Sequence, residues 1–242
     1  MRPHPCLLFA VLLAGGPVSA CANSLFDRVV VFGASVSAAE KAPSPGWILA
    51  RHMGTPEAEI FAFARGGADS EFLRPYLANI EALKPTLVVA VDLFFHDFKF
   101  SLFLPEGQKQ YLRDYIARLH DTGAVVVLGN IPSQVLLRHE HVNRYLESLQ
   151  PEFPRLVLID LDGAMHRLEK GGIRLQNEGR EIVLRKDDIF ADRVHPNEVG
   201  STLLANMILE NLEARFPDGI PAAAGNGDRQ RRSIPLPLPS DF

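Results

Sequence analysis

Short apolar runs alternate along the chain with longer segments whose apolar residues recur every three or four positions. The runs are nearly continuous and rich in β-branched residues, which predicts strands buried on both faces. They span residues 27–33, 59–64, 87–93, 124–128 and 155–160. The longer segments have the period of amphipathic helices, and Ser70 is the predicted cap of the second. Helices are expected at residues 45–53, 70–83, 111–119, 135–149 and 197–216, with a hairpin at 173–184.

The order of these elements predicts the fold class. Strands that alternate with helices, and that are apolar on both faces, form a mainly parallel sheet with helices on either side, which is an α/β fold. In such sheets, sites form at the carboxyl ends of the strands. Glycine-rich or polar segments follow three of the predicted strands, at residues 33–35, 66–67 and 95–97. We therefore expect a functional site where these segments meet.

Ser35 is the candidate nucleophile, because it directly follows the first predicted strand. Gly33 lets the chain turn sharply there, which exposes the serine at the edge of the sheet. A strand-to-helix turn also leaves backbone N–H groups free, and one of them could bind an oxyanion. The alternative is that Ser35 only caps a helix.

Asp192 and His195 are the candidate partners of this serine. A carboxylate three residues before a histidine can orient the ring through one nitrogen, and the other nitrogen can then take a proton from a nucleophile. The three residues together indicate nucleophilic hydrolysis, with the serine early in the chain and the Asp–His pair late. An isolated Asp-x-x-His also occurs in ordinary surface loops.

These residues resemble the motifs of the SGNH/GDSL hydrolase family. The first block of the family is Gly-Asp-Ser, and here it reads Gly-Ala-Ser, ending at Ser35. Residues 63–68 are similar to the second block, in which the N–H of Gly67 would serve an oxyanion hole. Asp192 and His195 match the fifth block. The resemblance implies a three-layer α/β/α sandwich of the flavodoxin-like type and ester hydrolysis through an acyl-Ser35 intermediate.

His96 is the largest departure from the family pattern. The third block is usually Gly-x-Asn-Asp, and residues 94–97 read Phe-Phe-His-Asp, so His96 stands where the family has Asn. A neutral imidazole has one N–H, which could replace the amide as an oxyanion donor beside the N–H groups of Ser35 and Gly67. The other interpretation is that His96 only packs and the hole has two backbone donors.

Composition narrows the class of protein. The chain has 242 residues, 47% of them hydrophobic, and a net charge of −4, which fits one medium-sized domain without a nucleic-acid footprint. No cluster has the spacing of zinc ligands, and no metal or cofactor is expected. His139 and His141 are two residues apart, which is poor geometry for a metal pair on a helix. Both are expected to be solvated.

The two ends of the chain are expected to lie outside the domain of residues 23–216. Residues 1–22 have the short apolar core and small-residue end of an export signal. Cleavage before Cys21 would leave a lipidated cysteine and a membrane tether, and cleavage before Asn23 would remove both cysteines. The protein is therefore expected to be exported, as a periplasmic protein or membrane-anchored lipoprotein, with secretion as the alternative. Residues 217–242 lack periodicity and predict a flexible tail.

Three hypotheses about function follow. The first is an ester hydrolase with the catalytic residues Ser35, Asp192 and His195, acting on a small-molecule or glycan ester. The second is an exported acyltransferase or deacetylase on an envelope polysaccharide, which differs only in the acceptor or the substrate. The third is a non-catalytic binding protein on the same scaffold, suggested by the altered third block.

Overall fold

A parallel sheet of five strands forms the centre of the computed structural model, which describes residues 24–97, 104–135, 139–177, 180–220 and 233–238. The strand order is β2-β1-β3-β4-β5. This is the flavodoxin-like order, so the predicted α/β sandwich is confirmed. The strands are β1 Val29–Gly33, β2 Ile60–Ala64, β3 Leu87–Ala90, β4 Val125–Gly129 and β5 Leu156–Ile159.

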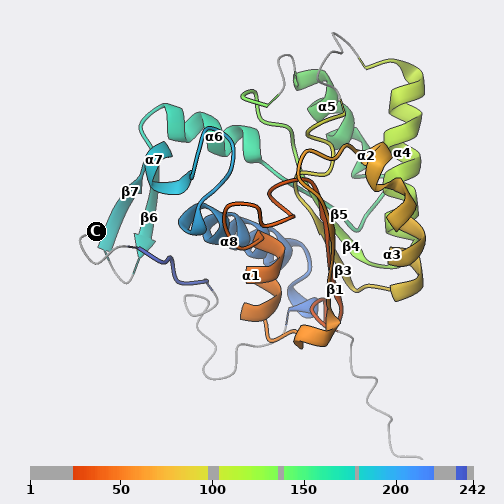
Figure 1. Cartoon of the computed structure of the whole chain (residues 1–242), viewed down its shortest axis with the longest axis horizontal. Coiled ribbons are helices and arrows are strands. Elements are labelled where there is room, and N and C mark those ends of the chain that lie inside the picture. Colours follow the sequence, from red (N-terminus) through yellow and green to blue (C-terminus); the bar gives the residue numbers. More distant parts are fainter. Residues whose placement is uncertain (1–23, 98–103, 136–138, 178–179, 221–232, 239–242) are drawn as a thin grey trace, which may run out of the picture.

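Helices cover both faces of this sheet (Figure 1). One face packs against α3 (Leu77–Leu83), α4 (Glu106–Asp121) and α5 (Glu140–Leu149), and the other against α1 (Pro45–His52) and α8 (Glu198–Arg215). Successive strand residues point to opposite faces, so Val30 lies in one apolar core and Val29 in the other. Apolar side chains cover both faces of the sheet, and for this reason the strands are unbroken apolar runs in the sequence.

A smaller group of elements extends sideways beyond α8 (Figure 1). It contains α6 (Leu161–Glu169), α7 (Lys186–Ile189) and the antiparallel hairpin of β6 (Ile173–Asn177) and β7 (Arg180–Leu184). The hairpin was predicted from the sequence and is confirmed, although residues 178–179 of its turn lie outside the described residues. The two helices were not predicted, because each is short and joined closely to a neighbouring strand.

The predicted helix over residues 70–83 is broken into three parts. These are α2 (Ser70–Leu73), a 3₁₀ turn at Arg74–Tyr76 and α3. Pro75 accounts for the break, since it has no N–H and its ring clashes with a continuing helix. The prediction that Ser70 is the cap is wrong: Asp69 accepts a hydrogen bond from the N–H of Phe72, and Ser70 is the first helical residue.

The predicted helix over residues 135–149 begins only at Glu140. His139, expected to be solvated, is instead buried, and its Nε2 lies 2.8 Å from Oδ2 of Asp162. Asp162 lies on α6, a helix that the sequence pattern did not predict. A buried polar side chain needs a hydrogen-bond partner, and α6 supplies it.

Two parts of the predicted flexible tail pack on the domain. Residues 217–219 form a 3₁₀ turn, and Ile234 is buried while its backbone exchanges two hydrogen bonds with the side chain of Asn206 on α8. The rest of the tail, the export signal at residues 1–22 and Cys21 lie outside the described residues. None of the helices in the described part of the chain is long and apolar enough to cross a bilayer.

Candidate active site

Ser35 lies on a tight turn that follows β1, and a buried carboxylate holds this turn. Asp92 accepts hydrogen bonds from the N–H groups of Ala34 (3.1 Å), Val36 (2.7 Å) and Ser37 (3.3 Å), and from the Ser37 hydroxyl (2.5 Å). The N–H of Ser35, the predicted oxyanion donor, is not among the donors to Asp92. The carboxylate therefore fixes the residues on both sides of the serine without using the serine itself.

Asp92 is a residue that sequence reasoning missed. It follows β3 and is only 1% exposed. Burial raises the pKa of Asp92 above its usual range, and the four hydrogen bonds oppose that rise. The sequence could have indicated this role, because Asp92 is a carboxylate inside the apolar run of residues 87–93. A buried acid needs hydrogen-bond or ionic partners.

Asp192 and His195 form the pair that the sequence predicts. Oδ2 of Asp192 lies 2.8 Å from Nδ1 of His195, and Oδ1 accepts hydrogen bonds from the N–H groups of Val194 and His195. These two backbone bonds, followed by the bond to the ring, hold the pKa of Asp192 below its usual range. The carboxylate is therefore charged at neutral pH and fixes the orientation of the imidazole.

The structure brings His195 and Ser35 together in one small pocket. Both residues line it, together with residues 36, 40–42, 196 and 201. The side chain of His195 is 21% exposed. In the described part of the chain no hydrogen bond joins the Ser35 hydroxyl to the ring, and catalytic hydrogen bonds are often long before substrate binds.

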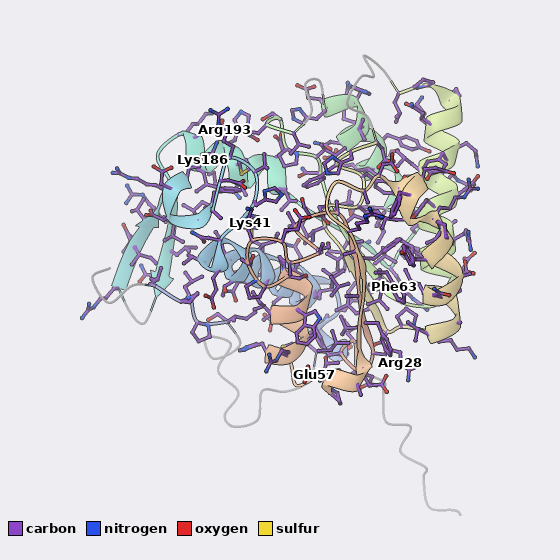
Figure 2. The ribbon with its side chains drawn as sticks, viewed as in Figure 1. Arg28, Lys41, Glu57, Phe63, Lys186 and Arg193 are labelled. Carbon is purple, nitrogen blue, oxygen red and sulfur yellow. The ribbon has the colours of Figure 1, made fainter. Side chains whose placement is uncertain are left out.

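Glu40 is the second residue that the sequence did not indicate. Its Oε2 lies 3.8 Å from Nε2 of His195, the nitrogen opposite Asp192. Its carboxylate also packs against Gly66, so closely that a side chain at Gly66 would collide with it. A negative charge thus lies between the predicted base and the glycine turn. A basic side chain lies in the same pocket: Lys41, which Figure 2 labels in the segment between β1 and α1.

Gly67 occupies the position that the second-block resemblance assigns to the oxyanion hole. It follows β2 in a turn closed by a hydrogen bond from the Ala68 N–H to the Arg65 carbonyl, and its φ of 70° favours glycine. A methyl group built on Gly67 would meet no atom within 4 Å, so the turn faces open space.

His96 is half-buried in the turns that follow β3, between Phe95 and Asp97. Asp97 accepts hydrogen bonds from the N–H (3.1 Å) and hydroxyl (2.5 Å) of Ser70, which ties the third block to the start of α2. Burial raises the pKa of Asp97 to about 6. The donor role of His96 stays a prediction.

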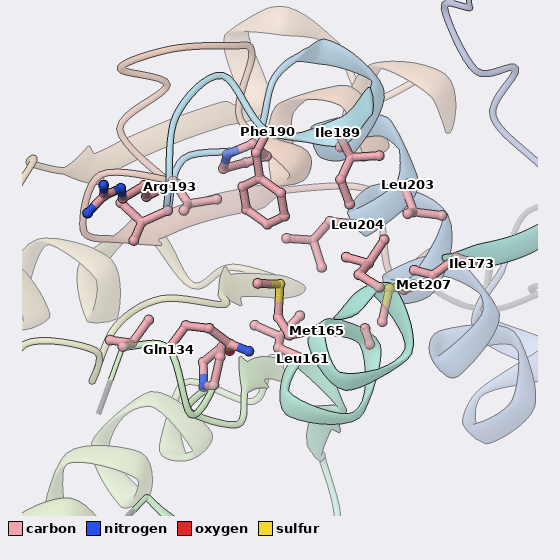
Figure 3. A pocket seen from close by; sticks show the side chains of 18 of the residues that line it. Gln134, Leu161, Met165, Ile173, Ile189, Phe190, Arg193, Leu203, Leu204 and Met207 are labelled. Atoms are coloured by element: carbon pink, nitrogen blue, oxygen red, sulfur yellow. The ribbon is translucent and has the colours of Figure 1, made fainter. Parts of the chain in front are cut away.

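A larger apolar cleft adjoins the small pocket. It contains about 720 Å³ of atom-free space, open mouth included, between α6, α7, α8 and the loops after β3 and β4 (Figure 3). No three His, Cys, Asp or Glu side chains of the described residues gather in a way that could hold a metal ion.

The sheet order, with these residues at the carboxyl edge of the sheet, defines an α/β protein of the flavodoxin-like class. No family model matches the chain, and no curated protein sequence matches it. Solved structures, in contrast, do match the chain. The crystal structure of TesA superposes with a TM-score of 0.54 at 21% identity, over 78% of this chain and 99% of TesA.

Two further solved structures have the same fold. The lipase/acylhydrolase from Enterococcus faecalis gives a TM-score of 0.52 at 19% identity, over 78% of this chain and 96% of its own. A GDSL-like lipase from Bacteroides thetaiotaomicron gives 0.50 at 14% identity, over 78% and 89%. At these identities the likeness concerns the fold, and it confirms the predicted SGNH architecture.

Proposed function

We propose that this protein is a serine ester hydrolase that acts through an acyl-Ser35 intermediate. The observation that carries the proposal is the Asp192–His195 pair, hydrogen-bonded at 2.8 Å, in the same pocket as Ser35. The lipases and acylhydrolase that share the fold support hydrolysis of esters as the reaction class.

The proposed reaction has two steps. Ser35 Oγ attacks the ester carbonyl while Nε2 of His195 takes the hydroxyl proton, and the same proton then passes to the departing alcohol. Water next attacks the acyl-serine, again giving a proton to Nε2, and the carboxylic acid leaves as Ser35 regains its proton. Asp192 holds the ring and stabilises the imidazolium formed in each step.

The oxyanion of each tetrahedral intermediate is proposed to lie against the N–H groups of Ser35 and Gly67, with His96 as a third donor. Asp92 supports this arrangement, because it occupies the amides beside Ser35 and leaves the Ser35 N–H to the oxyanion. Glu40 must move aside, or be neutralised, when the ester enters between His195 and Gly66.

Labelling with a fluorophosphonate probe tests the proposal. The wild-type protein should carry one phosphonyl adduct on Ser35 and hydrolyse p-nitrophenyl acetate. Ser35→Ala should lose the adduct and about 10⁴–10⁶ of the turnover while its melting temperature stays near the wild-type value. Ser37→Ala is the matched control, since that serine lies on the same turn but points to Asp92. A Ser35→Ala protein with wild-type turnover would overturn the assignment.

We also propose that the protein is exported and is tethered to the membrane by a lipid on Cys21. The support is the apolar, small-residue sequence of residues 1–22. Mass spectrometry of the mature protein decides it: a diacylglyceryl mass on Cys21 supports the tether, and an unmodified start at Asn23 excludes it.

A further inference from the structure

The apolar cleft beside the active site has no part in the chemistry proposed above. Of its lining residues only Gln134 and Arg193 have polar side chains. Figure 3 shows Met165 of α6 and Leu204 of α8 pointing into it from facing walls. A concave apolar surface with a few polar groups is the usual character of a small-molecule site.

The cleft shares part of its wall with the pocket of Ser35 and His195. Val36 and Pro196 line both cavities. Val36 directly follows the predicted nucleophile, and Pro196 directly follows the predicted base. The cleft therefore lies close enough to Ser35 to receive a chain attached to an ester there.

One wall of the cleft belongs to an apolar cluster separate from the two cores of the sandwich. This cluster combines α6, α7 and the first turns of α8 with the β6–β7 hairpin and with Leu236 and Leu238 of the tail. The five-stranded sheet does not need these elements to bury its faces, because α1, α3, α4, α5 and α8 already cover them. Side chains that leave a cleft open here forgo the stabilisation that filling it would give.

We propose that this cleft binds an aliphatic chain of the ester substrate, so that the substrate is a fatty ester and not an acetylated glycan. The inference rests on the proposed ester hydrolysis and specifies its substrate class. A glycan would bring many hydroxyl groups, each costly to bury without a partner, and only Gln134 and Arg193 offer side-chain partners. An alkyl chain has no such cost, and Met165 and Met207 are flexible side chains that adapt to it.

The chain can belong to the acyl group or to the alcohol, and two ester series distinguish these sources. The first runs from p-nitrophenyl acetate to the decanoate, and the second from ethyl to decyl acetate, followed by acid release. We expect kcat/KM to rise up to about fourfold per added methylene in one series until the chain fills the cleft. The series that rises identifies the side that binds. No rise in either series overturns the proposal.

A substitution in the cleft tests whether the chain binds there. Met165→Gln keeps the length of the side chain and places a buried amide on the cleft wall. It should lower the ratio of kcat/KM for the longest and shortest ester at least tenfold. Met53→Gln is the matched control, because Met53 follows α1 and is not among the residues that line the cleft, so it should leave the ratio unchanged. An unchanged ratio in Met165→Gln would contradict the assignment.

Binding of 1-octanol to the Ser35→Ala protein, measured by titration calorimetry, tests chain binding in the cleft separately from ester hydrolysis. Tight binding that weakens about fourfold per methylene removed, down to 1-butanol, supports the cleft even if the wild-type protein hydrolyses no ester. Hydrolysis of p-nitrophenyl acetate without octanol binding and without chain-length dependence leaves the proposed function standing and removes the cleft proposal. The binding should also show a negative heat-capacity change, since apolar surface is buried.

Discussion

Asp92→Asn tests the most specific claim about how the fold positions Ser35. Asp92 Oδ1 accepts from the Ala34 N–H and the Ser37 hydroxyl, and Oδ2 accepts from the N–H groups of Val36 and Ser37. An asparagine has the same shape but only one acceptor oxygen. Its NH₂ group must therefore replace one of these two oxygens and face the donors there.

The two orientations of the asparagine differ in cost. With NH₂ in place of Oδ2, two backbone N–H groups lose their acceptor. With NH₂ in place of Oδ1, the Ser37 hydroxyl can turn and accept, so only the Ala34 N–H is left unpaired. An unpaired buried donor costs about 1–3 kcal/mol, which sets the expected loss of unfolding free energy for the better orientation. Ser37→Ala removes one donor and leaves the backbone bonds, so it should cost about 1 kcal/mol.

Catalysis should suffer as well, because the distorted turn carries Ser35. A nucleophile displaced by about 1 Å can lose on the order of 10²-fold in rate, so we expect kcat to fall by about one to two orders of magnitude with little change in KM. Urea unfolding and kinetics on p-nitrophenyl acetate measure both effects. An Asp92→Asn enzyme within about 0.5 kcal/mol and twofold of wild type in stability and kcat would refute the reasoning.

Four further predictions concern the residues around Ser35. Glu40→Gln removes a charge 3.8 Å from Nε2 of His195; a substrate carboxylate that came within about 4 Å of Glu40 would be repelled by about 1 kcal/mol in water, so kcat/KM should rise by up to about fivefold more for p-nitrophenyl hemisuccinate than for the acetate, and equal gains would contradict it. His96→Ala should lower kcat about 10²–10³-fold, with part of the loss recovered in His96→Asn, and full kcat in His96→Ala would exclude the donor role. Burial raises the pKa of Asp97 to about 6, above the value of about 3.9 in an unfolded chain, so the folded state holds this proton more tightly, and the contribution of Asp97 to stability should fall as pH rises from about 4 to about 6. Asp97→Asn should flatten that fall in urea midpoints. Asp192→Asn should retain more turnover than His195→Ala, since Asp192 orients the ring and His195 carries the proton; the reverse order would contradict these roles.

The sheet could be predicted from the sequence because strands that are buried on both faces consist almost entirely of apolar residues. Each strand is a run of apolar, mostly β-branched residues, and the alternation with helices implies parallel strands. The position of the site followed from the same pattern, since Ser35, Gly67 and His96 all come after strands. The pairing of Asp192 with His195 needed only a separation of three residues.

Residues whose role depends on distant partners could not be predicted in the same way. His139 is buried because Asp162, 23 residues later, lies against it. Asp92 holds a turn 55–58 residues earlier. Glu40 approaches His195 only once the loop after β1 meets the loop before α8. Periodicity reports which face of an element is apolar, but it carries no information on which element will lie opposite.

The loop that carries Asp192 and His195 connects the cleft to the chemistry. Phe190 and Pro196 form an isolated bridge at its base, closed by a hydrogen bond from the Ala191 N–H to the His195 carbonyl at 2.9 Å. Phe190 and Pro196 also line the cleft. A chain bound in the cleft would thus press on the loop that carries His195, the proposed general base. Binding energy from a remote part of a substrate can raise kcat when it positions a catalytic group, so a short ester should lose turnover as well as affinity.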